Sequence, residues 1–436
     1  MARVCTALPD DGSKTNTIMK KKKMKEGKQC LYCDTCDGVS KEYAARRGWS
    51  EFDPVITTPE EGAVTGQQRH WVRLTSVCNQ NCLFCLDKEA QDGTIVPVKE
   101  ITDDLRRGRK DGAERVILSG GEATIHPDFF TIVKRAKKEG YAHVQVISNG
   151  QRLSSPEFFD AAVRAGVDEM TFSIHGHTSA LHDMLVGVEG AFIRALRALK
   201  NTKKYPDLIV SIDICINGLN YKYLPEMVEM FIKAGFYEFD LLHIIPFSSA
   251  WENRKILFFD VEKALPYLHK AFSFSKDPRV HIWTNRLPAH YLEGYERLIQ
   301  DPSKIMDEVA GRMEMFDDFF KKGREFYCRG ERCTYCFLEK FCTDLRSFKK
   351  NKILDPEKWP TCISKADSLK RGDALALKDV YDGKKVDMKK FVDFYIKERY
   401  FVKSLRCKKC KESKHCSGAP VALMKERGFK ILRTIK

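Results

Sequence analysis

The sequence has no long hydrophobic run and no hydrophobic signal segment. No stretch of about eighteen or more apolar residues occurs in its 436 residues, so no membrane-spanning helix is predicted. The first thirty residues are rich in lysine and lack an apolar core. Sixteen cysteines are too few for a small disulfide scaffold, and they are grouped at short gaps. This grouping favours metal binding in a reducing compartment, and we expect a cytoplasmic protein.

The composition predicts a globular protein with more than one part. A hydrophobic content of 43% is sufficient for a packed core, and the length suits one domain of barrel size with one or two smaller pieces. The formal charge of +15 suits an anionic partner, such as RNA, a phosphorylated small molecule, an acidic peptide or lipid headgroups. A solvated basic surface explains the same charge equally well.

Residues 1–65 are predicted to be a basic extension to the core. The stretch 14–28 contains seven lysines and little that is apolar, which is typical of a weakly ordered arm. It is followed by Cys30, Cys33 and Cys36, spaced so that three sulfurs can converge on one metal from a tight loop. The metal can be zinc, a single iron or a cluster, and the spacing does not choose among them.

Residues 66–250 alternate between apolar strands and amphipathic helices. The expected strands are nearly continuous apolar runs, as in buried parallel sheets. They are 70–77, 115–118, 143–148, 169–174, 208–216 and 238–245. Helical patterns occupy 128–138, 156–165 and 224–234 between them. Gly112, Gly140, Gly166 and Gly235 stand between a helix and the next strand, where a left-handed helix end is expected. The pattern predicts a parallel α/β fold, either doubly wound or an incomplete barrel.

The remainder divides into two predicted parts. Residues 251–325 have a largely helical pattern and are expected to form a helical linker. Residues 326–436 are rich in cysteine and contain an internal repeat with identical spacing in its two copies. The first copy is Cys333, Cys336 and Cys342, and the second is Cys407, Cys410 and Cys416. Paired C-x2-C elements are typical of zinc sites as well as of iron–sulfur clusters.

The central motif is a group of three cysteines that directly follows the first predicted strand. Cys78, Cys82 and Cys85 can give three thiolates to one iron–sulfur cluster and leave its fourth iron without a protein ligand. Phe84 precedes the last of them, where an aromatic ring can lie beside a flat group bound at the open iron. An open iron is a place for chemistry.

Other polar groups follow the later strands. Gly120, Gly121 and Glu122 end the second strand, where glycines allow backbone amides to approach a ligand and a carboxylate can accept from an ammonium group. Asn149 and Gly150 end the third strand, and Ser173 lies in the fourth, two residues before His175. All belong to the edge where parallel α/β folds place their sites. Cys215, inside a strand pattern, is expected to be a small core residue.

Together these residues resemble the radical S-adenosylmethionine superfamily, over roughly residues 66–250. The resemblance implies a partial (β/α)6 barrel of the TIM type, whose three-cysteine loop holds a [4Fe-4S] cluster. By this resemblance Cys78, Cys82 and Cys85 are the catalytic cluster ligands, and S-adenosylmethionine chelates the open iron. Its contacts are implied to be Phe84, Gly120, Gly121, Glu122, Asn149, Ser173, Asn217 and Ile245, with the last three less clearly marked by the sequence.

The C-terminal cysteines resemble the auxiliary-cluster extensions, termed SPASM or twitch, of the same superfamily. Those extensions use C-x2-C-x5-C-x3-C, but here Arg346 and Pro420 occupy the last position of the two copies. Cys328 is therefore expected to complete the first set, and Cys362 the second. The resemblance implies one or two auxiliary [4Fe-4S] clusters in addition to the catalytic one, with a further iron or zinc at the N-terminal cysteine trio.

The function implied by the resemblance is reductive cleavage of S-adenosylmethionine to a 5'-deoxyadenosyl radical, which abstracts hydrogen from a substrate C–H bond. An external electron donor of the flavodoxin or ferredoxin type is then expected. A peptide or protein substrate is the first expectation, since auxiliary extensions often accompany such substrates. Radical modification of RNA, a nucleotide or another small molecule is the enzymatic alternative. A non-catalytic zinc protein that binds nucleic acid is the alternative of another class.

Overall fold

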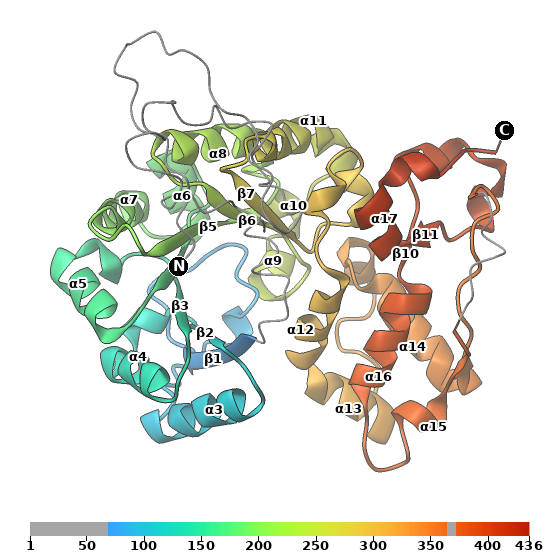
Figure 1. Ribbon diagram of the computed structural model, residues 1–436, viewed down its shortest axis with the longest axis horizontal. Helices are drawn as coiled ribbons and strands as arrows, with labels where there is room; N and C mark the ends of the chain where they lie inside the picture. The colour runs from blue at the N-terminus through green and yellow to red at the C-terminus, as the bar shows by residue number, and fades with distance from the viewer. Residues whose placement is uncertain (1–68, 364–371, 436) are drawn as a thin grey trace, which may run out of the picture.

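The computed structural model describes residues 69–363 and 372–435, and its largest part is a parallel sheet with helices on one face (Figure 1). Seven strands lie in sequence order and every neighbouring pair is parallel. They are β1 Arg69–Thr75, β2 Arg115–Gly120, β3 His143–Ser148, β4 Glu169–Ser173, β5 Ile209–Ile216, β6 Glu238–His243 and β7 His281–Asn285. Sequential order with parallel pairing makes this an α/β fold of the partial TIM-barrel type, as predicted.

Helices connect successive strands and cover the outer face of the sheet. They are α3 Val98–Lys110, α4 Phe129–Lys138, α5 Pro156–Ala165, α6 Ser179–Val186, α7 Ala191–Thr202, α8 Leu224–Lys233 and α11 Val261–Phe272. Two short helices, α9 Ser248–Glu252 and α10 Arg254–Leu257, precede α11. The six predicted strands and three predicted helices are confirmed to within two residues at nearly every boundary. The four glycines predicted at helix ends all have positive φ, which is also confirmed.

The seventh strand was not predicted. β7 lies inside the stretch 251–325, which the sequence pattern assigned to a helical linker, and that assignment is wrong at His281–Asn285. Only Ile282 and Thr284 of its five residues are buried, whereas the equally short β4 is buried at four, so the apolar signal of β7 is weak between two helical segments. Its hydrogen bonds to β6 extend the inner face of the sheet by one strand.

The two faces of the sheet differ in chemistry. On β4, Met170 and Phe172 pack in the main core with the helices, as do Ile212 and Ile214 of β5. The alternate side chains are polar or charged and point to the other, inner face, because successive residues of a strand face opposite sides. Glu169 is one of these inner-face residues. The inner face is thus the polar side of the sheet.

A second lobe follows β7 and carries the C-terminal cysteines. It contains α12 Ile305–Ala310, α13 Met313–Lys321, α14 Glu339–Asn351, α15 Leu377–Val380, α16 Met388–Phe394 and α17 Val421–Arg427, together with the short strand pairs β8 Ile353–Leu354 with β9 Leu375–Ala376, and β10 Phe401–Val402 with β11 Ala419–Pro420. Its aromatic core includes Phe316, Phe341 and Phe391. Figure 1 shows this lobe, in orange and red, beside the sheet. No helix within the described part of the chain is both long and apolar enough to cross a membrane.

Candidate active site and cysteine sets

The three-cysteine loop leaves the end of β1 and is fastened by backbone hydrogen bonds on two sides. The amide of Leu83 donates to the Leu185 carbonyl at 2.9 Å, at the end of α6. On the other side, the amide of Ser249 in α9 donates to the Cys85 carbonyl at 3.1 Å. Within the loop, the Cys85 amide donates to the Cys82 carbonyl at 3.1 Å and closes a tight turn. The loop is thereby held against segments more than a hundred residues away.

The three thiols are partly buried and close enough to affect one another. Burial raises the pKa of Cys78 to about 11, and the Glu122 carboxylate and Cys85 add to the rise. Burial also raises the pKa of Cys82, with further contributions from Cys78, Cys85 and Cys215. Such thiols stay protonated without a counter-charge, and a bound metal replaces their protons. The structure therefore brings the three predicted ligands together.

Two glutamines beside the loop fit a sulfur-rich group. The side-chain nitrogen of Gln80 is buried without a hydrogen-bond partner among the residues that the structure describes. That of Gln91 lies 3.6 Å from the Cys85 sulfur. Gln91 thus places an N–H donor next to a thiol, as is usual around iron–sulfur clusters, whose sulfurs accept hydrogen bonds. The side-chain oxygen of Gln80 accepts from the Cys82 thiol at 3.6 Å. Neither residue was predicted from the sequence, although Gln80 stands between Cys78 and Cys82.

Gly120 and Gly121 pack against the start of the cysteine loop. A Cβ atom on Gly121 would lie 2.3 Å from the Val77 carbonyl oxygen, and one on Gly120 would lie 2.3 Å from that of Thr75. The amides of Gly121 and Glu122 donate to the Thr75 and Val77 carbonyls, each at 2.8 Å. These amides were expected to face a ligand, but the chain itself uses them. Here the glycines set the position of the loop.

Glu122 is buried and fully engaged. It is 2% exposed, and its carboxylate accepts from Ser148 at 2.8 Å, from the Asn149 amide at 2.8 Å and from the amide and hydroxyl of Thr124. The Asn149 side chain in turn donates to Asn79 of the loop at 2.7 Å. Glu122 and Asn149 therefore link β2, β3 and the cysteine loop. A direct bond from Glu122 to the amine of S-adenosylmethionine needs one of these contacts to be exchanged.

The other predicted contacts differ in position. Phe84 packs edge-on against His175, with ring centroids 4.6 Å apart. Ser173 ends β4 and no hydrogen bond to its hydroxyl is found in the described part of the chain. Ile245 is 4% exposed just after β6. Asn217 differs from the prediction: it is 0% exposed, and its side chain donates to the Cys215 carbonyl and accepts from the Leu219 amide, each at 3.0 Å. It shapes the turn after β5, and this position gives no support to a contact with ribose.

Cys215 lies close to the three-cysteine loop. Its side chain packs in a small apolar cluster that includes Leu83 and Phe84, and burial raises its pKa to about 12. The expectation of a small core residue agrees with this packing. The position of Cys215 beside Cys82 was not predicted, because the two residues are far apart in the sequence and meet only when β5 packs near the loop after β1.

The C-terminal cysteines form two sets, each lining one cavity. Cys328, Cys333, Cys336 and Cys342 line a cavity of about 240 Å³ next to Pro246 and Phe247. Cys362, Cys407, Cys410 and Cys416 line a smaller one of about 20 Å³. The two cysteines expected to complete the repeats, Cys328 and Cys362, are thus each brought to the set predicted for them. All twelve cysteines within the described ranges are free thiols.

The two copies of the repeat share a local backbone structure. The Cys336 amide donates to the Cys333 carbonyl at 3.1 Å, and the Cys410 amide donates to the Cys407 carbonyl at 3.0 Å. This is the same turn that Cys82 and Cys85 form. The backbone amide of the third cysteine in each copy donates to the carbonyl four residues earlier, at 3.0 Å for Cys342 and 2.9 Å for Cys416. The repeat in the sequence is therefore a repeat in structure up to its third cysteine.

A charged group stands beside the first set. Burial raises the pKa of Cys336 to about 11 and that of Cys342 to about 12, while the Arg312 guanidinium acts in the opposite direction on both. Arg312 is held by Glu308 at 3.2 Å and lies over the Phe247 ring at 4.4 Å.

The predicted N-terminal trio, Cys30, Cys33 and Cys36, lies outside the residues that the structure describes.

The cysteine loop lies in the part of the chain that matches a known family. A parallel α/β sheet that presents three thiols at the carboxyl end of its first strand is suited to a cluster with an open iron. Residues 72–231 match the family model described as the Radical SAM superfamily. This part of the chain is therefore similar to the radical SAM superfamily, and the match covers less than half of the 436 residues.

Curated relatives agree with this class over part of the chain. An AdoMet-dependent heme synthase of Methanosarcina barkeri is 27% identical over 223 residues, which are 50% of this chain and 61% of the relative. A probable GTP 3',8-cyclase of Saccharolobus islandicus is 28% identical over 179 residues, 40% of this chain and 56% of the relative. The chain thus spans about three-fifths of the length of these relatives.

One solved structure resembles the chain over most of its length. Streptococcus suis SuiB bound to precursor peptide SuiA is 16% identical, with a TM-score of 0.42, and the likeness covers 90% of this chain and 87% of SuiB. A TM-score below 0.5 supports no inference about function.

Proposed function

We propose that this chain is a three-cluster radical enzyme that abstracts hydrogen from a peptide or protein substrate. A [4Fe-4S] cluster at Cys78, Cys82 and Cys85 and its bound S-adenosylmethionine supply the 5'-deoxyadenosyl radical. The single observation that carries the proposal is the loop itself, in which three interacting thiols lie beside the side-chain amides of Gln80 and Gln91. Electrons come from an external donor of the flavodoxin or ferredoxin type. The cytoplasmic location expected from the sequence stays a prediction.

In this proposal the surrounding residues hold the loop and the cofactor. Glu122 and Asn149 keep the loop at the end of the sheet, through the contacts to Ser148 and Asn79. Phe84 offers an aromatic surface to the adenine. The Ser173 hydroxyl, which has no hydrogen-bond partner among the described residues, lies at the inner face. The polar inner face receives the substrate. Close packing around the loop keeps water and stray hydrogen donors from the radical.

The two C-terminal sets are proposed to hold auxiliary [4Fe-4S] clusters. Four thiols on one cavity match the usual cysteine ligation of such a cluster. Within the described ranges, no three His, Cys, Asp or Glu side chains are close enough to hold a single metal ion. A cluster is bound through separate irons, so its cysteines need not meet at one point. Zinc is the alternative metal for these thiols, and metal analysis distinguishes it from an iron–sulfur cluster.

Subtractive metal analysis tests the cluster assignments. We expect the anaerobically reconstituted chain to hold about twelve irons, or more if the N-terminal trio also binds iron, because each of three clusters carries four. Replacing Cys78, Cys82 and Cys85 by alanine should remove about four irons and abolish 5'-deoxyadenosine formation with dithionite as reductant. Cys336→Ala with Cys342→Ala, and Cys407→Ala with Cys410→Ala, should each remove a further similar number. A colourless protein that holds only zinc contradicts the proposal.

A nucleotide substrate is the second candidate, because one curated relative is named as a GTP 3',8-cyclase. Isotope transfer distinguishes the two. Hydrogen abstraction moves a substrate hydrogen into 5'-deoxyadenosine, so a deuterated substrate makes that product heavier. The enzyme is given separate peptide and nucleotide fractions from cells grown in heavy water. Deuterium transfer from the peptide fraction supports the first candidate, and transfer only from the nucleotide fraction replaces it with the second.

A further inference from the structure

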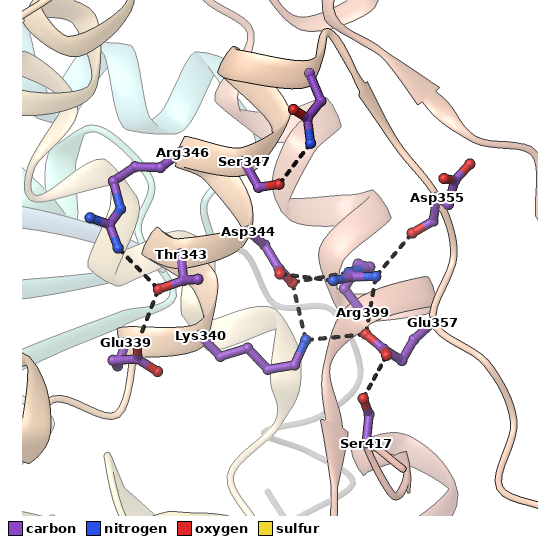
Figure 2. A network of polar contacts seen from close by, with 11 residues as sticks. Glu339, Lys340, Thr343, Asp344, Arg346, Ser347, Asp355, Glu357, Arg399 and Ser417 are labelled. Atoms are coloured by element: carbon purple, nitrogen blue, oxygen red, sulfur yellow. Dashed lines mark hydrogen bonds and ion pairs between the residues drawn. The ribbon is translucent and has the colours of Figure 1, made fainter. Parts of the chain in front are cut away.

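Helix α14 carries Cys342 of the first cysteine set, and it also carries Arg346, which lines the cavity of that set. Arg346 follows Cys342 by four residues, which places both on one side of the helix, and it lines the same cavity as the four cysteines. Figure 2 shows Arg346 and Asp344 on opposite sides of α14, with Asp344 directed toward Arg399. Arg346 therefore belongs to the side of the helix that faces the first set.

The hydrogen bonds of Arg346 are incomplete. One terminal nitrogen donates to the Thr343 hydroxyl at 3.2 Å, and that hydroxyl donates to Glu339 at 3.0 Å. The Nε atom is buried and has no hydrogen-bond partner within residues 69–363 and 372–435. Over the same residues, no carboxylate forms an ion pair with this guanidinium. A buried charged donor without an acceptor is costly, so its partner is expected to be a bound group.

The cavity indicates what that group is. Its four thiols are ligands for an iron–sulfur cluster, and a cluster ligated by four thiolates is an anion whose sulfurs accept hydrogen bonds. We propose that Arg346 donates through Nε to the cluster at Cys328, Cys333, Cys336 and Cys342, and raises its reduction potential. This inference rests on the proposed auxiliary cluster. A cation and a donor both favour the reduced, more negative state, which is why the potential rises.

The second set provides an internal comparison. Pro420 stands four residues after Cys416, where the first copy has Arg346, and proline offers neither a charge nor an N–H group. The N–H groups that approach the sulfurs there come from the backbone, from Gly418 to Cys416 at 3.2 Å and from Ile435 to Cys410 at 3.4 Å. The arginine contact is therefore a property of the first set, and a change at Arg346 should affect one auxiliary cluster only.

The test is a redox titration followed by electron paramagnetic resonance on the full-length reconstituted chain. Cys78, Cys82 and Cys85 are replaced by alanine to remove the catalytic signal, and Cys336→Ala assigns the signal of the first set. We expect Arg346→Met to lower the midpoint potential of that signal and to leave the other unchanged. Arg346→Lys, which keeps the charge, should lower it less. Electron–nuclear double resonance should show one exchangeable proton coupling lost in Arg346→Met.

A matched control lies in the same cavity. Arg329 also lines it, but its side chain is 54% exposed and its guanidinium already pairs with Glu325. Arg329→Met removes the same charge and should have little effect. A shift in Arg346→Met no larger than that in Arg329→Met, with the proton coupling retained, overturns the inference. Absence of iron at the first set in the parent chain instead overturns the auxiliary-cluster proposal, and iron analysis shows which has failed.

Discussion

The ion-pair network behind α14 should govern the stability of the C-terminal lobe. Asp344 is 9% exposed and accepts two bonds from Arg399, at 3.0 and 2.8 Å, and one from Lys340 at 3.1 Å. Arg399 also contacts Glu357 at 3.0 Å, and Glu357 accepts from Ser417, which follows Cys416 (Figure 2). The two carboxylates and the two cations balance each other. Removal of one carboxylate therefore leaves a net positive charge that is partly shielded from water.

The perturbation that tests this is Asp344→Asn, which keeps the shape and removes the charge. Loss of one partner from a fully buried pair costs about 3–5 kcal/mol. Arg399 and Glu357 are each 18% exposed and Lys340 is 35% exposed, so solvent screening reduces the cost. We expect about 2–3 kcal/mol, which corresponds to an increase of about 30- to 150-fold in the equilibrium for local opening.

Amide hydrogen exchange of peptides from α14 measures this local opening directly, without an assumption that the whole chain unfolds in one step. The matched control is Asp393→Asn, whose partner Lys389 is 75% exposed on α16. An exposed pair of this kind contributes less than about 1 kcal/mol. If exchange of α14 increases no more in Asp344→Asn than in Asp393→Asn, the network does not stabilise the lobe.

Three further outcomes are expected. Gly121→Ala places a Cβ 2.3 Å from a carbonyl oxygen of the cysteine loop, so iron analysis should show loss of the catalytic cluster alone, whereas Gly311→Ala, with nothing closer than 3.6 Å, should retain it. Burial raises the pKa of Glu169 from 4.5 to about 7 and outweighs its ion pair with Arg115, so the stability of the fold should fall by about 3 kcal/mol as pH rises from 4.5 to 7. The free energy of unfolding of Glu169→Gln apoprotein, measured by denaturation, should not show this fall with pH. An equal dependence on pH in the two proteins would refute the prediction. Phe341→Ala, in a fully buried aromatic core, should cost about 3–5 kcal/mol by denaturation, and half-exposed Ile353→Ala far less.

The strands and the cysteine loop could be predicted because their signals are local. Apolar runs such as Val116, Ile117 and Leu118 in β2 mark strands buried in a parallel sheet. The cysteine spacing alone indicates that the three thiols share one metal group. β7 was missed because only two of its five residues are buried, so its apolar signal is weaker than that of the equally short β4. The grouping of Cys328 and Cys362 with their sets could be anticipated from the incomplete repeat, since each copy lacked one thiol.

The side-chain chemistry of the site could not be predicted in the same way. The role of Asn217 depends on which atoms its side chain meets, and these come from its own turn. The use of the Gly121 amide depends on the register between β1 and β2, which no composition reveals. The carboxylate of Glu122 is similarly occupied by residues that follow β2 and β3. Contacts of this kind arise only after distant segments pack.

The two C-terminal sets share one turn but differ in the length of chain that completes them. Cys328 precedes Cys333 by five residues, whereas Cys362 precedes Cys407 by 45. Closing the longer loop costs about 2 kcal/mol more in chain entropy. In the proposed enzyme the first set captures its cluster as a nearly local event, whereas the second requires Cys362 and Cys407 to meet across the longer segment. Under iron limitation, the second set should be the first to empty.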